Sequence, residues 1–88
     1  MQRKTFSKLT DGQKSKVQDN LNKAVKRIID IVSLYEYFQN DDKKKIIFDN
    51  TVDIYYYQYS NIITKESYQD NLKVMLKYLN IDCYSNKM

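Results

Sequence analysis

The chain has 88 residues, of which 42% are hydrophobic and 30% are charged, and its formal net charge is +4. This length suits one small domain, and the hydrophobic share is large enough for a core, which excludes a disordered chain over most of the sequence. The sequence contains one glycine, Gly12, and no proline, whereas sheets need turn residues between strands, so the composition predicts helices joined by short polar connections.

Two residue counts argue against enzymatic chemistry. The chain has no histidine, the side chain best suited to acid–base catalysis and metal binding near neutral pH. Its single cysteine, Cys83, has no intrachain disulfide partner, which fits a reducing compartment, and lacks the usual histidine that activates a thiol. No stretch approaches the ~20 apolar residues of a membrane span, and no secretory signal opens the sequence. We therefore expect a cytoplasmic, non-enzymatic protein without a metal or cofactor.

Residues 1–11 are polar and basic, and we expect a basic N-terminal arm that is frayed or forms one short turn. If residues 2–9 fold back, they would add a short additional helix. The first 27 residues hold eight Lys and Arg against two Asp, a net charge of +6, whereas residues 28–88 carry a net charge of −2. The positive charge is therefore concentrated in the N-terminal third.

One helical stripe runs from Gln13 to about Gln39. Its apolar residues follow steps of three and four and so line a single face, namely Val17, Leu21, Ala24, Val25, Ile28, Ile31, Val32, Tyr35 and Phe38. Asp11 is the expected N-cap, because its carboxylate can accept hydrogen bonds from free amides of the first turn. The segment 40–42 ends the stripe with Asn and Asp, which favour turns.

A second helix is expected from Lys43 to about Ser60. Its main apolar stripe consists of Phe48, Val52, Tyr55 and Tyr59. Ile47 and Ile54 lie about a quarter-turn away, which is typical of a helix placed between neighbours. The run 54–57 also suits a strand, but the sequence offers no second convincing strand to pair with it.

The last helix is expected to begin after Thr64, whose hydroxyl suits an N-cap, with Glu66 in the first turn where the helix dipole favours a negative charge. Its apolar stripe consists of Tyr68, Leu72, Met75, Leu76 and Leu79. Residues 80–88 are expected to form a polar C-terminal tail. The sequence thus predicts a single all-α domain over residues 1–88, an antiparallel up-down bundle of three long helices, or four with the short N-terminal one.

Four basic side chains gather opposite the apolar stripe of the first helix, and these are Lys16, Lys23, Lys26 and Arg27. Such a basic face suits nucleic-acid phosphates or the anionic inner leaflet of a membrane. An ordinary solvated helix also carries such charges. Four cations on one helix are few for binding either nucleic acid or a membrane. No helix-turn-helix, zinc-ligand or RNA-binding aromatic pattern accompanies it.

Nine tyrosines are many for a chain of this length, and tyrosine suits surfaces that must be soluble when free and apolar when bound. Four of them lie on apolar stripes and are expected in the core, namely Tyr35, Tyr55, Tyr59 and Tyr68. The remaining five tyrosines are candidates for a contact surface, namely Tyr37, Tyr56, Tyr57, Tyr78 and Tyr84.

The remaining charged clusters of the second helix predict no site. Three lysines at 43–45 follow two aspartates, which is typical of a solvated surface of mixed sign. Asp49 and Asp53 are four residues apart and share a face, but no further ligand or pocket is evident. We therefore expect neither an acid–base pair nor a metal site there.

The stretch from Val52 to Leu79, VDIYYYQYSNIITKESYQDNLKVMLKYL, has three recognisable parts. An aromatic-rich helix over 54–59 is followed by a short polar link with the aliphatic pair Ile62 and Ile63. A last helix then opens with Thr64-Lys65-Glu66 and continues with amphipathic spacing. This stretch resembles the second half of the enterocin A-type bacteriocin immunity proteins, which are small, basic, antiparallel four-helix bundles.

The resemblance implies a protein that remains inside the producer of a class IIa-like bacteriocin. There it would protect the membrane receptor, a mannose phosphotransferase permease, from being held open as a pore, without neutralising the peptide directly. In the family, specificity is attributed largely to the C-terminal half, which corresponds here to the last helix and tail. The resemblance thus implies partner-binding roles for Lys73, Lys77, Tyr78 and Tyr84.

Two other hypotheses stay open at the level of sequence. The basic N-terminal third would suit a small nucleic-acid-binding or regulatory protein of phage or plasmid origin. The tyrosine-rich surface would suit a structural adaptor or an inhibitor of another protein. The pattern does not separate an adaptor from an immunity protein, because both recognise partners through helix faces.

Overall fold

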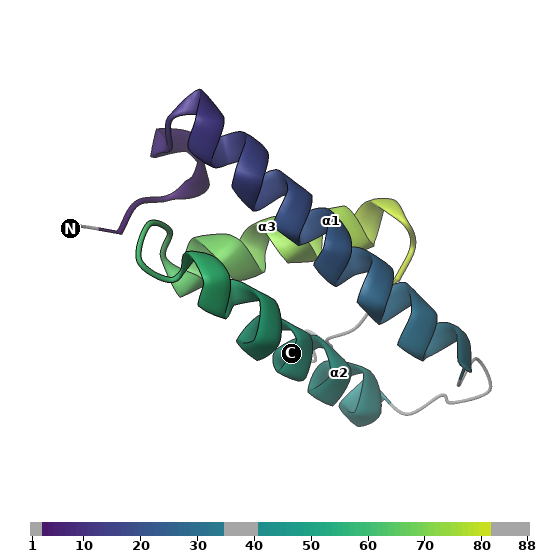
Figure 1. Cartoon of the computed structure of the whole chain (residues 1–88). Helices are drawn as coiled ribbons and strands as arrows, with labels where there is room; N and C mark the ends of the chain where they lie inside the picture. The colour runs from purple at the N-terminus through teal and green to yellow at the C-terminus, as the bar shows by residue number, and fades with distance from the viewer. Residues whose placement is uncertain (1–2, 35–40, 82–88) are drawn as a thin grey trace, which may run out of the picture.

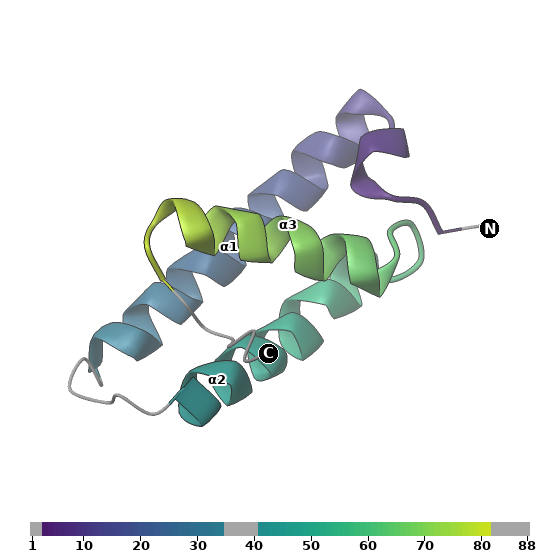
Figure 2. The same ribbon diagram turned by 180° about the vertical axis from the view of Figure 1, so that it is seen from behind.

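The structure is a computed structural model, and it describes residues 3–34 and 41–81 of the chain. Those residues form three α-helices, α1 (Asp11–Leu34), α2 (Asp41–Tyr56) and α3 (Lys65–Tyr78), with short 3-10 helices at Phe6–Lys8 and Tyr57–Tyr59. α2 runs antiparallel to α1, and α3 crosses one face of this pair obliquely (Figures 1 and 2). The predicted all-α bundle is confirmed.

The start of α1 is capped by Thr10, and the prediction of Asp11 as the N-cap is wrong. The Thr10 Oγ1 accepts from the backbone N–H of Gln13 at 3.2 Å, and the Gln13 Oε1 accepts from the N–H of Thr10 at 3.1 Å. This reciprocal pair is a capping box, which satisfies two amides that the helix leaves free. Asp11 instead lies in the first turn, where its charge complements the helix dipole.

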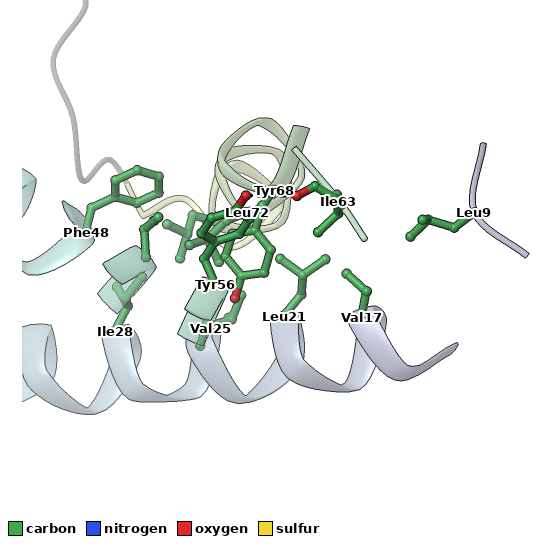
Figure 3. Close-up of a cluster of buried hydrophobic side chains, with 13 residues drawn as sticks. Leu9, Val17, Leu21, Val25, Ile28, Phe48, Tyr56, Ile63, Tyr68 and Leu72 are labelled. Atoms are coloured by element: carbon green, nitrogen blue, oxygen red, sulfur yellow. Dashed lines mark hydrogen bonds between the residues drawn. The ribbon is translucent and has the colours of Figure 1, made fainter. Parts of the chain in front are cut away.

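The core forms where the apolar stripes of the three helices meet. Figure 3 shows Val17, Leu21, Val25 and Ile28 of α1 directed toward side chains of α2 and α3. The buried apolar residues are Leu9, Val17, Leu21, Ala24, Val25, Ile28, Phe48, Val52, Tyr56, Ile63, Tyr68, Leu72 and Leu76. Of the predicted first stripe, Ile31 and Val32 are half-buried, while Tyr35 and Phe38 lie outside the described residues.

The N-terminal arm packs against the bundle and does not fray in its described part. The Lys4 N–H donates to the carbonyl of Ile62 and the Lys4 carbonyl accepts from the N–H of Thr64, both at 3.0 Å. The Phe6 N–H donates to the hydroxyl of Ser67 at 2.8 Å, and the side chain of Leu9 is buried. The fold-back therefore places a three-residue 3-10 helix beside α3, where the sequence left open a short additional helix.

In α2 the core register differs from the predicted one. Tyr56, expected at a contact surface, is only 8% exposed, whereas Tyr55 and Tyr59 are half-buried. Tyr56 continues the ladder of Phe48 and Val52 in steps of four, and its ring centroid lies 5.5 Å from that of Tyr68. The α-helix then ends at Tyr56 and tightens into a 3-10 helix, which turns the following tyrosines off the stripe.

α3 begins after Thr64 as predicted, because the Thr64 Oγ1 accepts from the N–H of Ser67 at 3.2 Å. Its far end differs from the prediction: Leu79 is 51% exposed and not part of the core. The helix stops at Tyr78 because Asn80 takes a φ of 57° and the N–H of Ile81 donates back to the Leu76 carbonyl at 3.0 Å. This is the Schellman pattern of helix termination, with Asn in the left-handed position.

Candidate functional site

The last turns of α3 bring together two of the four residues expected to bind a partner. Lys77 is exposed, and the side chain of Tyr78 is 84% exposed. With Val74, which is 53% exposed, they line a hollow of about 530 Å³. Lys73 is half-buried one turn before Lys77, and Tyr84 lies outside the described residues. Val74, Lys77 and Tyr78 are named the α3 surface below.

The α3 surface combines three kinds of chemistry within one helical turn. Residues three and four apart are neighbours on a helix, so Val74 lies beside both Lys77 and Tyr78. An exposed aliphatic side chain, a tyrosine ring with its hydroxyl and an ammonium group suit a protein partner that offers an apolar contact and a carboxylate. The sequence located Lys77 and Tyr78 but did not single out Val74, which lies between these two residues on the helix face turned away from the apolar stripe.

The four residues of the predicted basic face are all exposed on α1, namely Lys16, Lys23, Lys26 and Arg27. Two carboxylates share that face. Asp19 precedes Lys23 by four residues and Asp30 follows Lys26 by four, so each aspartate is a helical neighbour of a lysine. The six side chains together carry a net charge of +2, and the face is mixed rather than uniformly positive.

A groove between α1 and α2 was not singled out from the sequence. One hollow of about 320 Å³ is lined by Lys23, Lys26, Arg27, Asp30, Ile31 and Tyr55. A second, of about 340 Å³, is lined by Arg27, Ile31, Ile47, Asn50, Thr51, Asp53 and Ile54. Because Arg27 and Ile31 line both, the hollows adjoin, and together they are named the α1–α2 groove. In the sequence, this groove is indicated by Ile47 and Ile54, which lie seven residues apart on one side of the second helix and off its main apolar stripe.

A buried polar network lies at the centre of the bundle. The Tyr68 hydroxyl of α3 donates to the Asn20 Oδ1 of α1 at 2.5 Å. The Asn20 Nδ2 in turn donates to the Tyr55 carbonyl at 3.0 Å and to the Gln58 Oε1 at 3.3 Å. Burial, followed by the nearby Tyr55, raises the pKa of Tyr68 above its ordinary value, which keeps the hydroxyl protonated as a donor. The network joins all three helices, and the side chains of Asn20 and Tyr68 find their partners within it.

The carboxylates of α2 form no converging site in the described part of the chain. Asp53 accepts from the Lys65 ammonium at 3.3 Å, and both side chains are more than half exposed. Asp49 is exposed on the same helix. Over residues 3–34 and 41–81, no three His, Cys, Asp or Glu side chains are placed to hold a metal ion. Over the same residues, no helix has the length and apolar character that a membrane crossing requires.

Comparison of the chain with protein-family models, with curated proteins and with solved structures found no match. The features that bear on function are therefore those of the chain itself. They are the pattern of residues 52–79, the exposed α3 surface and the α1–α2 groove.

Proposed function

We propose that this chain is a non-enzymatic bacteriocin immunity-type protein. It protects the cell that makes it from a class IIa-like pore-forming bacteriocin by acting on the receptor complex from the cytoplasmic side. The observation that carries the proposal is the exposed α3 surface, where the resemblance implies recognition. Tyr78 and Val74 leave much of their apolar surface in water there, beside the charged Lys77.

The local structure of residues 52–79 supports the proposal. An aromatic helix ends at Tyr56, and the link that follows places Ile63 in the core and Ile62 at its edge. Thr64 then caps a last helix that exposes its outer face. These are the parts on which the resemblance to the immunity proteins rests. The proposed partner is the mannose phosphotransferase permease with its bound bacteriocin, and contact with the membrane surface belongs to the same proposal.

The chemistry of the α3 surface fits recognition of a protein. Interface energy is usually concentrated in a few residues, among which tyrosine is enriched because it buries a large rigid ring and keeps a polar tip. Tyr78 is such a residue at the end of a helix, with Val74 one turn before it. Lys77 adds a charge that selects among partners more than it adds affinity.

The nucleic-acid alternative has weaker support from the described residues. Asp19 and Asp30 lie among the four cations of the basic face and would oppose phosphates on the same surface. Counterion release, which supplies most non-specific affinity for DNA, grows with the number of phosphates neutralised. A face with a net charge of +2 neutralises few phosphates and therefore gains little affinity for DNA.

The test is protection of a bacteriocin-sensitive strain that expresses the chain, challenged with a panel of class IIa-like bacteriocins. We expect survival against one or two members of the panel. Tyr78→Ala and Lys77→Glu should each lower the highest bacteriocin dose that the strain survives at least tenfold, because each removes a group from the α3 surface.

Matched controls lie elsewhere on the molecule. Tyr57→Ala removes a tyrosine that is 79% exposed, and Lys45→Glu reverses an exposed lysine of α2. Both should protect like the unaltered chain. Sensitivity to the whole panel, with the protein shown to be expressed and folded, would overturn the proposed function. Equal protection by the α3 variants and the controls would show that the α3 surface takes no part in protection.

A further inference from the structure

We propose that the α1–α2 groove binds an acidic amphipathic helix of a partner protein, at a surface separate from the α3 surface. α3 covers one face of the α1–α2 pair, as the two opposite views show (Figures 1 and 2). On α1, Gln18 contacts Met75 of α3, whereas Arg27 and Ile31 lie on another side of the helix and line both hollows of the groove. The groove is therefore a concave face between two antiparallel helices.

Apolar side chains line much of the groove, together with the polar residues Asn50 and Thr51. Ile31 of α1 and Ile47 of α2 are half-buried, and Ile54 is 54% exposed although it lines the second hollow. Tyr55 adds a half-buried ring to the first hollow. An amphipathic helix inserts residues spaced by three, four and seven into such a groove and removes their apolar surface from water.

The charge of the rim selects the partner. Lys23, Lys26 and Arg27 line the first hollow from α1, and Asp30 is the carboxylate among its lining residues. On the α2 side Asp53 accepts from Lys65, which offsets its charge. An occupant with carboxylates along the flank that meets α1 complements this rim, and the complementarity favours acidic over basic helices.

The geometry also favours a helix over other occupants. From Lys23 to Ile31 the groove follows about eight residues of α1, roughly 12 Å, which two to three turns of a docked helix would span. An extended peptide gains affinity by adding to a sheet edge, and the described residues carry only the single β-bridge of Lys4 and Ile63. A phosphate backbone or a lipid headgroup layer would leave the apolar side chains of the groove without a matching partner.

The test uses the full chain as bait for a displayed library of helices of about 15 residues, roughly 22 Å long. The peptides share a leucine stripe and carry Glu, Gln or Lys at random on both flanks. We expect selection to enrich Glu on one flank only. A selected peptide, labelled with fluorescein, should bind at least tenfold more weakly to Arg27→Glu and severalfold more weakly to Ile54→Ser, as read by fluorescence anisotropy.

Two substitutions on α3 are matched controls. Lys77→Glu reverses an exposed cation and Val74→Ser truncates a side chain that is 53% exposed, close to the 54% of Ile54. Both should leave peptide binding unchanged. All four positions are exposed, so circular dichroism melts should match the unaltered chain.

Several outcomes would overturn the groove proposal. These are no preference for Glu in the selected peptides, equal weakening by the α3 controls, or no effect of Arg27→Glu and Ile54→Ser. Anionic vesicles of phosphatidylglycerol or duplex DNA that bind more tightly than the selected peptide, and lose binding in Arg27→Glu, would assign the face to lipid or nucleic acid instead. The proposed immunity function is tested on the α3 variants, so the two proposals fail separately.

Discussion

Among single residues, Tyr68 and Asn20 form a buried hydrogen bond that joins α3 to α1. Tyr68→Phe keeps the ring against Tyr56 but removes the hydroxyl that donates to the Asn20 Oδ1. A buried acceptor then loses its donor, and we expect the free energy of unfolding to fall by about 1–2 kcal/mol. Urea denaturation measures this fall. Tyr78→Phe, at an 84% exposed position, should change it by less than about 0.5 kcal/mol. Equal midpoints for the two variants would contradict the network.

The same hydroxyl predicts a loss of stability in alkali. Burial raises the pKa of Tyr68 in the folded state, whereas in the unfolded chain it titrates near its ordinary value of 10.0. The unfolded state therefore releases the proton first, so this contribution is complete below pH 10 and declines as pH rises above it. From one tyrosine, the free energy of unfolding falls by at most about 1.4 kcal/mol per pH unit.

The measurement compares the pH dependence of urea unfolding between the unaltered chain and Tyr68→Phe, from about pH 9 to pH 11. All other titratable groups are common to both proteins, so the difference between the two curves reports on Tyr68. We expect the unaltered chain to lose stability more steeply above pH 10. Parallel curves would mean that Tyr68 titrates like an exposed tyrosine.

At the scale of elements, the start of α1 distinguishes two capping schemes. Thr10→Ala removes the side chain that accepts from the Gln13 N–H, and we expect a loss of about 1 kcal/mol in the free energy of unfolding. Asp11→Asn removes only a charge that complements the helix dipole, which costs about 0.5 kcal/mol at low salt. Thermal melts in low and high salt separate the two effects, because only the second is screened. Because Asn caps as well as Asp, the cap itself is tested with alanine: a larger loss from Asp11→Ala than from Thr10→Ala would restore Asp11 as the cap.

Across the whole molecule, the N-terminal arm is held by hydrogen bonds to Ser67 of α3 and to Ile62 and Thr64 of the preceding link. Ser67→Ala removes the acceptor of the Phe6 N–H, which lies 61 residues away in sequence. We expect the amides of Lys4 and Phe6 to exchange with solvent at least tenfold faster, because this end of the chain opens locally without unfolding the helices. Hydrogen exchange followed by NMR reads both amides, and the amides of α1 at Leu21 and Val25 are internal controls. Unchanged exchange at Phe6 would show that the arm is held elsewhere.

The features that can be predicted from the sequence alone are local ones. One glycine and no proline favour helices over a sheet, and spacing by three and four places Val17, Leu21 and Leu72 on buried faces, because a helix repeats every 3.6 residues whatever surrounds it. Thr64 was found as a cap because its partner, the Ser67 amide, is three residues away. The Thr-x-x-Gln capping box at residues 10–13 is equally local, but the adjacent Asp11 is also a favoured N-cap residue, so residue type does not distinguish the two.

Which helix faces meet depends on how the three helices pack, and the sequence pattern does not show it. Tyr56 lies in the core and Tyr55 at its edge because α2 contacts α3 as well as α1, and a pattern along one helix does not fix the direction of its neighbours. The Asn20–Tyr68 bond joins residues 48 apart. The α1–α2 groove likewise unites Arg27 with Ile54 across two helices. Such contacts arise from packing over long sequence separations, which periodicity does not encode.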